Sequence, residues 1–381
     1  MPCAPFRGRL METAFVLGLS LGAPAFASDL LPPAGTSIGQ LDVTRMADGL
    51  IEPWGLAFLP DGRFVVTERG GVLSLFPPQG GAPIARFDDF PGLVVNGQGG
   101  LLDVSVPRDF AQSREILVTY VKQQGRGEGS AVAALRLSTD GTSVEAVRPL
   151  FEVAPGSMGG RHFGSRIVEA PDGTLFVTLG DRGADRLAQD VTRHEGSVVR
   201  LTRDGTPASS GLFGGDGLPE LYSKGHRNPQ GATLDSEGRL WVVEHGARGG
   251  DELNLVQPGR NYGWPEISFG VNYDGSAIGT GTEAPGMEQP VHYWDPSIAP
   301  SGLMIYSGAM FPEWQGDVFI GSLKFDLISR LDPAQGYAEE QIQTAQTGRV
   351  RDIRQGPDGS IWFLSVEDGA VYRLSRPAPA G

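Results

Sequence analysis

Residues 58–76 read FLPDGRFVVTERGGVLSLF, a Pro-Asp-Gly turn followed by two short runs of β-branched and aromatic residues. Runs of this kind between turn residues are typical of short β-strands joined by tight turns. The same pattern returns at residues 169–183 (EAPDGTLFVTLGDRG), 233–246 (TLDSEGRLWVVEHG) and 354–375 (RQGPDGSIWFLSVEDGAVYRLS). The chain therefore repeats one turn-and-strand unit along most of its length.

Two weaker copies fill the gaps, at residues 106–121 (VPRDFAQSREILVTYV) and 311–331 (FPEWQGDVFIGSLKFDLISRL). Six copies at intervals of roughly 45 to 80 residues are typical of the blades of a β-propeller. We therefore predict an all-β fold, a six-bladed β-propeller of four-stranded antiparallel blades. A β-sandwich or two separate β domains is the alternative, which is disfavoured because the repeat keeps its phase from residue 58 to residue 375.

The segment before the first copy, residues 36–50 (TSIGQLDVTRMADGL), has no turn motif of its own. We expect a strand near Gln40 to Met46 to supply the outer strand of the last blade, which contains Trp362, and so to close the ring. The 56 glycines and 29 prolines agree with a chain that reverses direction often.

The first 27 residues have the pattern of a secretory signal peptide. Two arginines precede an apolar run at 14–21, and Ala-Phe-Ala at 25–27 matches a cleavage site. We expect a periplasmic or secreted mature chain, with residues 28–381 forming one propeller domain. Its only cysteine, Cys3, would leave with the signal, so no disulfide is available. A buried N-terminal strand or anchor is the alternative reading.

The overall charge limits the class of partner. With 31 Lys and Arg against 45 Asp and Glu, the formal net charge is −14. This argues against nucleic acid or an anionic membrane surface and favours a small-molecule ligand. The sequence has no HExxH or Cys/His cluster for zinc and no GxGxxG on a βαβ unit for a nicotinamide. The pattern G-x-S-x-G occurs only as GLSLG in the signal and GTSIG at residue 35, outside any strand-to-helix turn.

One histidine stands out as a candidate general base. His162 precedes the hairpin of residues 165–180, and Asp181 at its far end would return beside it. A carboxylate against one imidazole nitrogen fixes the tautomer and raises the basicity of the other nitrogen. His194 and His292 lack such a partner in the sequence pattern, and we expect them to be structural or solvated.

Cations gather in the same glycine-flanked loops. The stretch GHRNPQG at residues 225–231 contributes Arg227, and later loops contribute Lys324, Arg349 and Arg351. Loops on one face of a propeller form a cup around its axis. Several cations near one axis predict a polyanionic ligand, because arginine binds carboxylates in a bidentate manner. Calcium cannot be assigned from spacing alone, although carboxylate and carbonyl oxygens are abundant around residues 251–264.

Eight motifs together resemble one family. They are PWGLAFLPDGRFVVTERGG, NGQGGLLDV, HFGSRI with TLGDRG, GHRNPQG, EHGARGGDELNLVQPGRNYGWP, PSIAPSG, FIGSLK and RVRDIRQGPDG. In this order, from about Pro53 to Leu374, they are similar to the glucose/sorbosone dehydrogenase family. Its members are soluble six-bladed propellers that use pyrroloquinoline quinone (PQQ) and calcium. Within the family, the likeness is greatest to the bacterial soluble aldose sugar dehydrogenases.

The resemblance implies a role for each matching position. His162 corresponds to the general base and Asp181 to the acid that orients it. The residues that would bind the quinone, a tricarboxylate, are Gln98, Arg227, Asn228, Lys324, Arg349 and Arg351. Those that would bind calcium are the carbonyls of Gly246 and Ala247 at the cofactor, and Glu252 and Tyr262 at a second, structural ion, with Tyr273 or Asp274 as a further candidate.

The resemblance also implies a reaction: His162 removes the proton of an aldose C1 hydroxyl while hydride moves to the quinone, and Arg227 with calcium stabilises the charge that develops. The product is a lactone, and an external acceptor takes the electrons. Arg161 departs from the acid found in the glucose dehydrogenases, and Ala247 replaces a proline. The loops that build their dimer have no counterpart, so we expect a monomer. The alternatives are a calcium-dependent propeller lactonase and a catalytically silent propeller that binds sugars or proteins.

Overall fold

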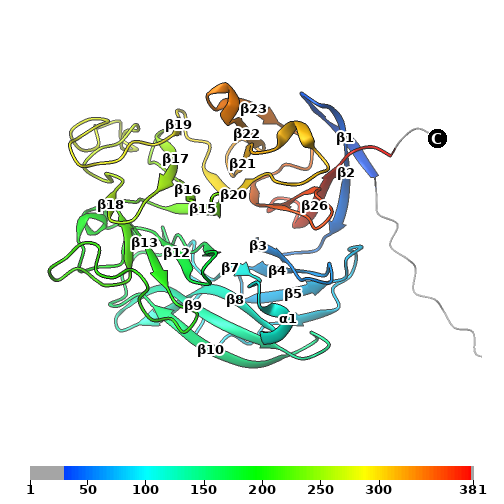
Figure 1. Ribbon diagram of the computed structural model, residues 1–381, viewed down its shortest axis with the longest axis horizontal. Coiled ribbons are helices and arrows are strands. Elements are labelled where there is room, and N and C mark those ends of the chain that lie inside the picture. Colours follow the sequence, from blue (N-terminus) through cyan, green and yellow to red (C-terminus); the bar gives the residue numbers. More distant parts are fainter. Residues whose placement is uncertain (1–29, 379–381) are drawn as a thin grey trace, which may run out of the picture.

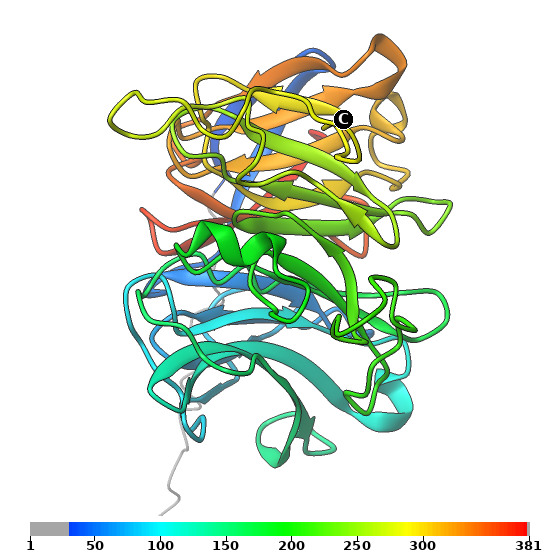
Figure 2. The ribbon, with the colours of Figure 1, turned by 90° about the vertical axis from the view of Figure 1, so that its left-hand side faces the viewer.

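The computed structural model describes residues 30–378, and the predicted signal peptide with Cys3 lies outside this range. Six small antiparallel sheets surround a central axis, and the chain runs once around the ring (Figure 1). The predicted six-bladed β-propeller is therefore confirmed. Seen from the side, loops leave the blades on both faces (Figure 2).

The first three blades are given from the innermost strand outward. Blade one contains β3 (Pro53–Phe58), β4 (Phe64–Glu68), β5 (Val72–Phe76) and β6 (Ala85–Phe87). Blade two contains β7 (Leu101–Ser105), β8 (Glu115–Gln124), β9 (Gly127–Leu137) and β10 (Val144–Glu152). Blade three contains β11 (Ile167–Glu169), β12 (Leu175–Leu179), β13 (Ser197–Leu201) and β14 (Leu221–Lys224), with β18 (Arg260–Asn261) added in parallel at its edge.

The remaining blades follow in the same order. Blade four contains β15 (Pro229–Leu234), β16 (Leu240–Glu244), β17 (Asp251–Val256) and β19 (His292–Trp294). Blade five contains β20 (Pro300–Ile305), β21 (Val318–Ser322), β22 (Ile328–Asp332) and β23 (Ala338–Ile342). Blade six contains β24 (Val350–Gln355), β25 (Ile361–Ser365), β26 (Ala370–Ser375), β2 (Gly39–Ala47) and β1 (Leu30–Thr36). The short helices are α1 (Phe110–Ser113), η1 (Asp185–Gln189), η2 (Pro312–Trp314) and η3 (Pro333–Gln335).

The repeated turn has one physical basis in several blades. In blades one, three and six the turn aspartate accepts a hydrogen bond from the backbone N–H two residues later, at 3.0 Å. The glycine that follows the aspartate has a positive φ, for example 86° at Gly62 and 82° at Gly173. Glycine adopts such angles without a steric penalty, so the Asp-Gly pair sets the reversal from the first strand to the second.

Apolar side chains fill the spaces between neighbouring blades. Strand β4 is buried on both faces, as a strand packed between two other sheets must be. Leu56 and Phe64 of blade one pack with Trp362 and Leu364 of blade six. The core is thus divided among the blade interfaces, and every blade depends on its two neighbours for burial.

Blade six closes the ring with the N-terminal segment. Strand β2 pairs antiparallel with β26, with Asp42 opposite Ser375 and Thr44 opposite Arg373. This confirms the predicted outer strand in the blade that contains Trp362. Strand β1, which adds a fifth strand outside β2, was not predicted.

Charged side chains brace the axis between the inner strands. Arg166 Nη1 lies 2.9 Å from Asp103 Oδ1 and 3.1 Å from Asp352 Oδ1, and these side chains are at most 1% exposed. Arg354 Nη2 lies 3.1 Å from the same oxygen of Asp103. We call these four residues the axial brace. The cavities at the two ends of the axis, about 940 and 370 Å³, share no lining residue.

Within residues 30–378, no helix combines the length and apolar character that crossing a membrane requires.

Candidate active site

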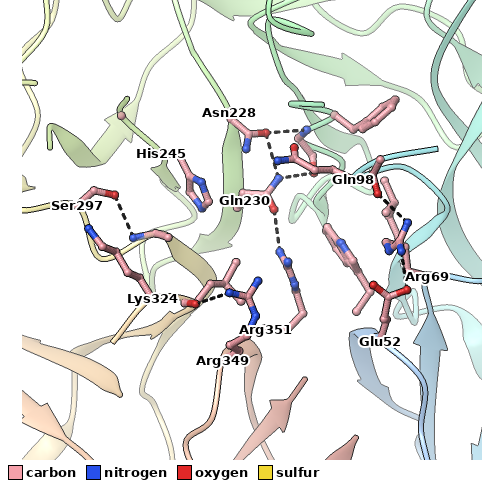
Figure 3. A pocket seen from close by; sticks show the side chains of 18 of the residues that line it. Glu52, Arg69, Gln98, Asn228, Gln230, His245, Ser297, Lys324, Arg349 and Arg351 are labelled. Atoms are coloured by element: carbon pink, nitrogen blue, oxygen red, sulfur yellow. Dashed lines mark hydrogen bonds and ion pairs between the residues drawn. The ribbon is translucent and has the colours of Figure 1, made fainter. Parts of the chain in front are cut away.

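The larger cavity is a cup of about 940 Å³ at one end of the propeller axis (Figure 3). Among its described lining residues, five cationic side chains face three carboxylates, an excess of two positive charges in a chain of net charge −14. The cations are Arg69, Arg248, Lys324, Arg349 and Arg351, and the carboxylates are Glu52, Asp326 and Glu367. This excess fits an anionic ligand.

Five of the six predicted cofactor ligands line the cup, and the sixth, Arg227, lines a smaller cavity beside it (Figure 3). Lys324 comes from the loop after β21, and Arg349 and Arg351 come from the start of β24. Arg351 Nη1 donates to Gln230 Oε1 at 3.0 Å, and Arg349 Nη1 donates to the carbonyl of Leu323 at 2.8 Å. Burial, followed by the nearby cations Arg166 and Arg349, lowers the pKa of Arg351 to about 9. An anion beside it would relieve this unfavourable environment.

The predicted base and its acid are brought together as expected. His162 Nδ1 lies 2.7 Å from Asp181 Oδ1. The Asp181 side chain is 1% exposed and that of His162 is 12% exposed. Burial lowers the pKa of His162 below 6.5, although Asp181 opposes this change. The imidazole is therefore neutral near pH 7, with Nδ1–H donated to Asp181 and Nε2 available as a base.

Two polar residues connect the base to the cup. Gln98 Oε1 accepts the backbone N–H of His162 at 2.7 Å, and Gln98 itself lines the cup. Asn228 Oδ1 accepts from Gly164 N at 3.3 Å and from Gln230 Nε2 at 3.1 Å. Both residues thereby hold the loop of His162 at the edge of the cup. Figure 3 shows Asn228, Gln230 and Gln98 in the cup.

The guanidinium of Arg227 lies over the predicted calcium-binding loop. Its Nη1 donates to the carbonyls of Gly246 and, at 3.4 Å, of His245, while its buried Nε has no partner among the described residues. Gly246 and Ala247 both line the cup, and their binding of calcium stays a prediction. The Gly246 carbonyl accepts from Arg227 in this structure and would have to turn from that donor to bind an ion.

A second, small cavity of about 10 Å³ lies beside the cup and is lined by Glu252 and Tyr262 among others. Burial and the neighbouring Glu244 raise the pKa of Glu252 to about 8. Asn254 Nδ2 donates to both glutamates, at 3.1 and 3.2 Å, and its own buried Oδ1 has no partner within the part of the chain that the structure describes. The Tyr262 hydroxyl is used elsewhere, by Leu255 O and Gln257 N, so only the tyrosine carbonyl remains for an ion.

Tyr273 is not brought to Glu252 and Tyr262. It is 74% exposed and lines the cup instead of the small cavity. The reason is the turn at 272–276, in which Asp274 Oδ1 accepts from Ser276 N at 2.9 Å and holds the tip of the loop over the cup. Asp274 is thereby also occupied by its own turn.

The other histidines have structural surroundings. His226 is fully buried, with Nδ1 2.8 Å from Glu244 Oε1 and Nε2 2.9 Å from Ser223 Oγ. His194 Nε2 lies 2.7 Å from Glu220, and the His292 ring packs edge-on against Trp294. These contacts agree with the expectation that His194 and His292 are structural, and they give His226 a structural place as well.

The family model for glucose/sorbosone dehydrogenase matches residues 50–373. The chain belongs to this family. Aldose sugar dehydrogenase YliI of Escherichia coli K12 is 40% identical over 345 residues, covering 88% of this chain and 93% of the relative.

Solved structures from the glucose/sorbosone dehydrogenase family superpose over most of the chain. The apo-form of the soluble aldose sugar dehydrogenase of Escherichia coli has a TM-score of 0.84 at 38% identity, covering 88% of this chain and 100% of that one. The PQQ-bound form of aldose sugar dehydrogenase from Streptomyces coelicolor has a TM-score of 0.73 at 26% identity, covering 90% and 99%.

Several residues that line the cup of this family member were not singled out from the sequence. His245 lines the cup, and its Nε2 lies 2.6 Å from the carbonyl of Pro300. Burial, then the cations Arg227 and Arg351, lower its pKa to about 3. Trp54 and Arg69 also line the cup. The sequence did contain a signal for His245. It directly follows the second strand of blade four, and the second strand of blade three leads in the same way to Asp181.

Proposed function

We propose that this protein is a PQQ- and calcium-dependent aldose dehydrogenase. It oxidises the C1 hydroxyl of an aldose to a lactone and passes two electrons to an external acceptor. The observation that carries the proposal is the pair His162 and Asp181, 2.7 Å apart, at the edge of a cup with excess positive charge. A base and an anion-binding site side by side are what this oxidation requires of the protein.

His162 acts as the general base. Its Nδ1–H is donated to Asp181, so Nε2 carries the lone pair that accepts the hydroxyl proton of the sugar. The lowered pKa keeps this nitrogen unprotonated near neutral pH. Asp181 then stabilises the imidazolium that forms, because its carboxylate is buried against the ring.

The cup supplies the contacts that a tricarboxylate such as PQQ needs. Lys324, Arg349 and Arg351 would hold carboxylates. Gln98 and Asn228, which line the cup, would hold ring oxygens by hydrogen bonds, and so would Arg227, which lines the neighbouring small cavity and donates to the carbonyl of Gly246. When bound, PQQ supplies the two-electron acceptor for the hydride that leaves C1. The neighbouring relatives support this cofactor, since a PQQ-bound aldose sugar dehydrogenase shares the fold.

The small cavity fits a calcium ion by the chemistry of its donors. The buried carboxylate of Glu252, which lines the cavity, is a hard oxygen ligand of the kind that calcium prefers. Asn254, which donates to Glu252, has an Oδ1 without a partner among the described residues. The Tyr262 carbonyl would complete the set. A second ion would use the carbonyls of Gly246 and Ala247 at the cup, where it would polarise an oxygen of the bound cofactor.

The axial brace disfavours the lactonase alternative. A propeller hydrolase of that type requires side-chain carboxylates free to hold a metal on the axis. Asp103 and Asp352 are already paired with Arg166 and Arg354 there. Among residues 30–378, no group of three His, Cys, Asp or Glu side chains is arranged to hold a metal. A silent binding propeller would not require the neutral, oriented imidazole of His162.

Reconstitution tests the proposed function. The purified protein should bind PQQ with calcium, seen as quinone absorbance that remains with the protein after gel filtration. It should then oxidise aldoses with an artificial dye as electron acceptor. Arg351→Ala should retain less quinone and recover part of its activity with excess PQQ. Absence of both bound quinone and dye-linked activity at saturating PQQ and calcium would contradict the proposal.

Calcium removal tests the small cavity separately. An ion that binds only the folded state stabilises it by mass action, so exhaustive chelation should lower the melting temperature without PQQ present. Glu252→Gln should abolish the difference between calcium and chelator. Glu237→Gln, an exposed glutamate on the same blade, is the matched control and should retain the difference. An identical melt with and without calcium in the parent counts against this ion site.

A further inference from the structure

The indole of Trp264 completes the surroundings of the proposed base. Its Nε1–H donates to Asp181 Oδ2 at 2.8 Å. The other oxygen of Asp181 accepts from His162 Nδ1 and from the backbone N–H of Gly183, each at 2.7 Å. Both oxygens of this buried carboxylate are therefore occupied, and Trp264 provides the only donor to Oδ2 among the described residues.

The same indole contacts the neighbouring cation. The guanidinium carbon of Arg227 lies 5.2 Å from the centroid of the Trp264 ring, within the range of a cation–π interaction. Trp264 thus lies between the carboxylate that orients the base and the guanidinium that caps the carbonyl of Gly246. The Trp264 side chain therefore contacts both the negatively charged Asp181 and the positively charged Arg227.

The loop holds the indole in place through its backbone. Trp264 N donates to the carbonyl of Gly225 at 2.9 Å, and Gln189 Nε2 donates to the carbonyl of Trp264 at 2.7 Å. These partners belong to blade three and the loop that follows it, whereas Trp264 belongs to the insertion of blade four. The side chain is therefore fixed on the elements that carry Asp181 and Arg227.

We propose that Trp264 is a positioning residue for the general base. It fixes the rotation of the Asp181 carboxylate and shares its negative charge, so that Asp181 orients His162 without raising the pKa of the imidazole into the neutral range. A hydrogen bond to an ionised carboxylate stabilises its charge, so a carboxylate that loses a donor attracts a proton on a neighbouring ring more strongly. This role rests on the proposed function of His162.

The charged and titratable groups around His162 define what a substitution changes. Asp181 faces its Nδ1, Arg227 and Arg161 are the cations that act on it, and His245 is the nearby imidazole. Trp264→Phe leaves these four groups in place and keeps an aromatic ring beneath Arg227. The N–H donor to Asp181 is lost, together with one ring of the indole.

The first measurement is the titration of His162 in the cofactor-free protein, followed by NMR of its imidazole protons. The sequence contains five histidines, so the signals can be assigned by single substitution. In Trp264→Phe the pKa of His162 should rise by about half a unit or more. The control is Trp241→Phe, since Trp241 Nε1 donates to Asp235 Oδ2 at 2.9 Å at the far end of blade four. This control should leave the titration of His162 unchanged.

The second measurement uses the protein loaded with PQQ and calcium. In Trp264→Phe the value of kcat for aldose oxidation should fall about tenfold with little change in KM, because orientation of the base is lost and sugar binding is not. The acidic limb of the pH profile should move to higher pH with the pKa of His162. Trp241→Phe should change neither quantity.

The outcomes separate this inference from the proposed function. A His162 titration in Trp264→Phe that matches both the parent and Trp241→Phe would overturn the positioning role. A shifted titration in a protein that never oxidises sugars would support the role and contradict the proposed function. If Trp264→Phe does not fold, benzothienylalanine at this position keeps the fused ring and removes only the N–H donor, and the same two readings apply.

Discussion

His162 has a backbone φ of 53°, in the left-handed region that residues other than glycine seldom adopt. Gln98 holds its N–H and Arg182 N donates to its carbonyl, so the loop imposes this angle from two neighbouring blades. Unusual backbone angles that the surroundings enforce are frequent where side chains must be aimed accurately. The angle directs the imidazole toward Asp181 at the rim of the cup.

Substitution of the proposed base, His162, should separate catalysis from cofactor binding. His162→Ala should still bind PQQ, because the cationic contacts of Arg227, Lys324, Arg349 and Arg351 remain. Its turnover should fall by about 10² to 10⁴, the usual contribution of a positioned base. Dye-linked aldose oxidation at saturating PQQ and calcium measures the rate, and absorbance counts the bound quinone independently.

Two further variants separate the loss of rate from the loss of bound quinone. Asp181→Asn should retain quinone and lose less rate than His162→Ala, since Asp181 only orients the ring. Arg351→Ala should lose quinone first and activity as a consequence. If His162→Ala binds PQQ and turns over like the parent, the assignment of the base is wrong.

The sequence could predict that two residues lie close together where they stand at the two ends of one hairpin. His162 and Asp181 flank one hairpin, so the repeat alone brings them close. Tyr273 and Trp264 lie in the long insertion between β18 and β19, where no repeat constrains the path of the chain. Their positions depend on hydrogen bonds to other blades, such as that of Trp264 to Asp181, which no local pattern reveals.

At the scale of the elements, the blades could be predicted because each turn has its own chemistry. Aspartate and glycine fix the reversal, and the apolar run that follows must be a strand buried on both faces. Strands β1 and β18 could not be predicted in this way. Each pairs at the outer edge of a blade, and β18, which lies in the chain between two strands of blade four, joins the sheet of blade three.

The axial brace makes a prediction about how the inner strands are held. Arg166→Met would leave the buried carboxylates of Asp103 and Asp352 with one fewer cation, and should lower the free energy of unfolding by about 3 to 5 kcal/mol. Arg136→Met is the control, because the pair of Arg136 with Glu145 is exposed and should contribute at most about 1 kcal/mol. Denaturant unfolding of both variants measures the difference. Equal stability of the two would show that the brace does not hold the inner strands together.

At the scale of the whole molecule, the ring depends on the pairing of β2 with β26. A chain that begins at Pro53 should leave the β26 edge unpaired, and exposed edges of this kind associate with other chains. We expect a large loss of thermal stability and self-association, measured by melting and by gel filtration. A chain that begins at Gly39 lacks only β1 and should lose much less. A monomeric chain beginning at Pro53 with the parent melting temperature would contradict the closure.

The axial brace also has a kinetic consequence. The cup and the cavity on the opposite face share no lining residue, so we expect a molecule in the cup to enter and leave at the face of the propeller on which the cup opens. Under the proposed function, the sugar and the electron acceptor would then use the same entrance to the cup and bind there one after the other. We expect the oxidised product to leave before the acceptor binds, so that double-reciprocal plots at several acceptor concentrations should be parallel instead of crossing.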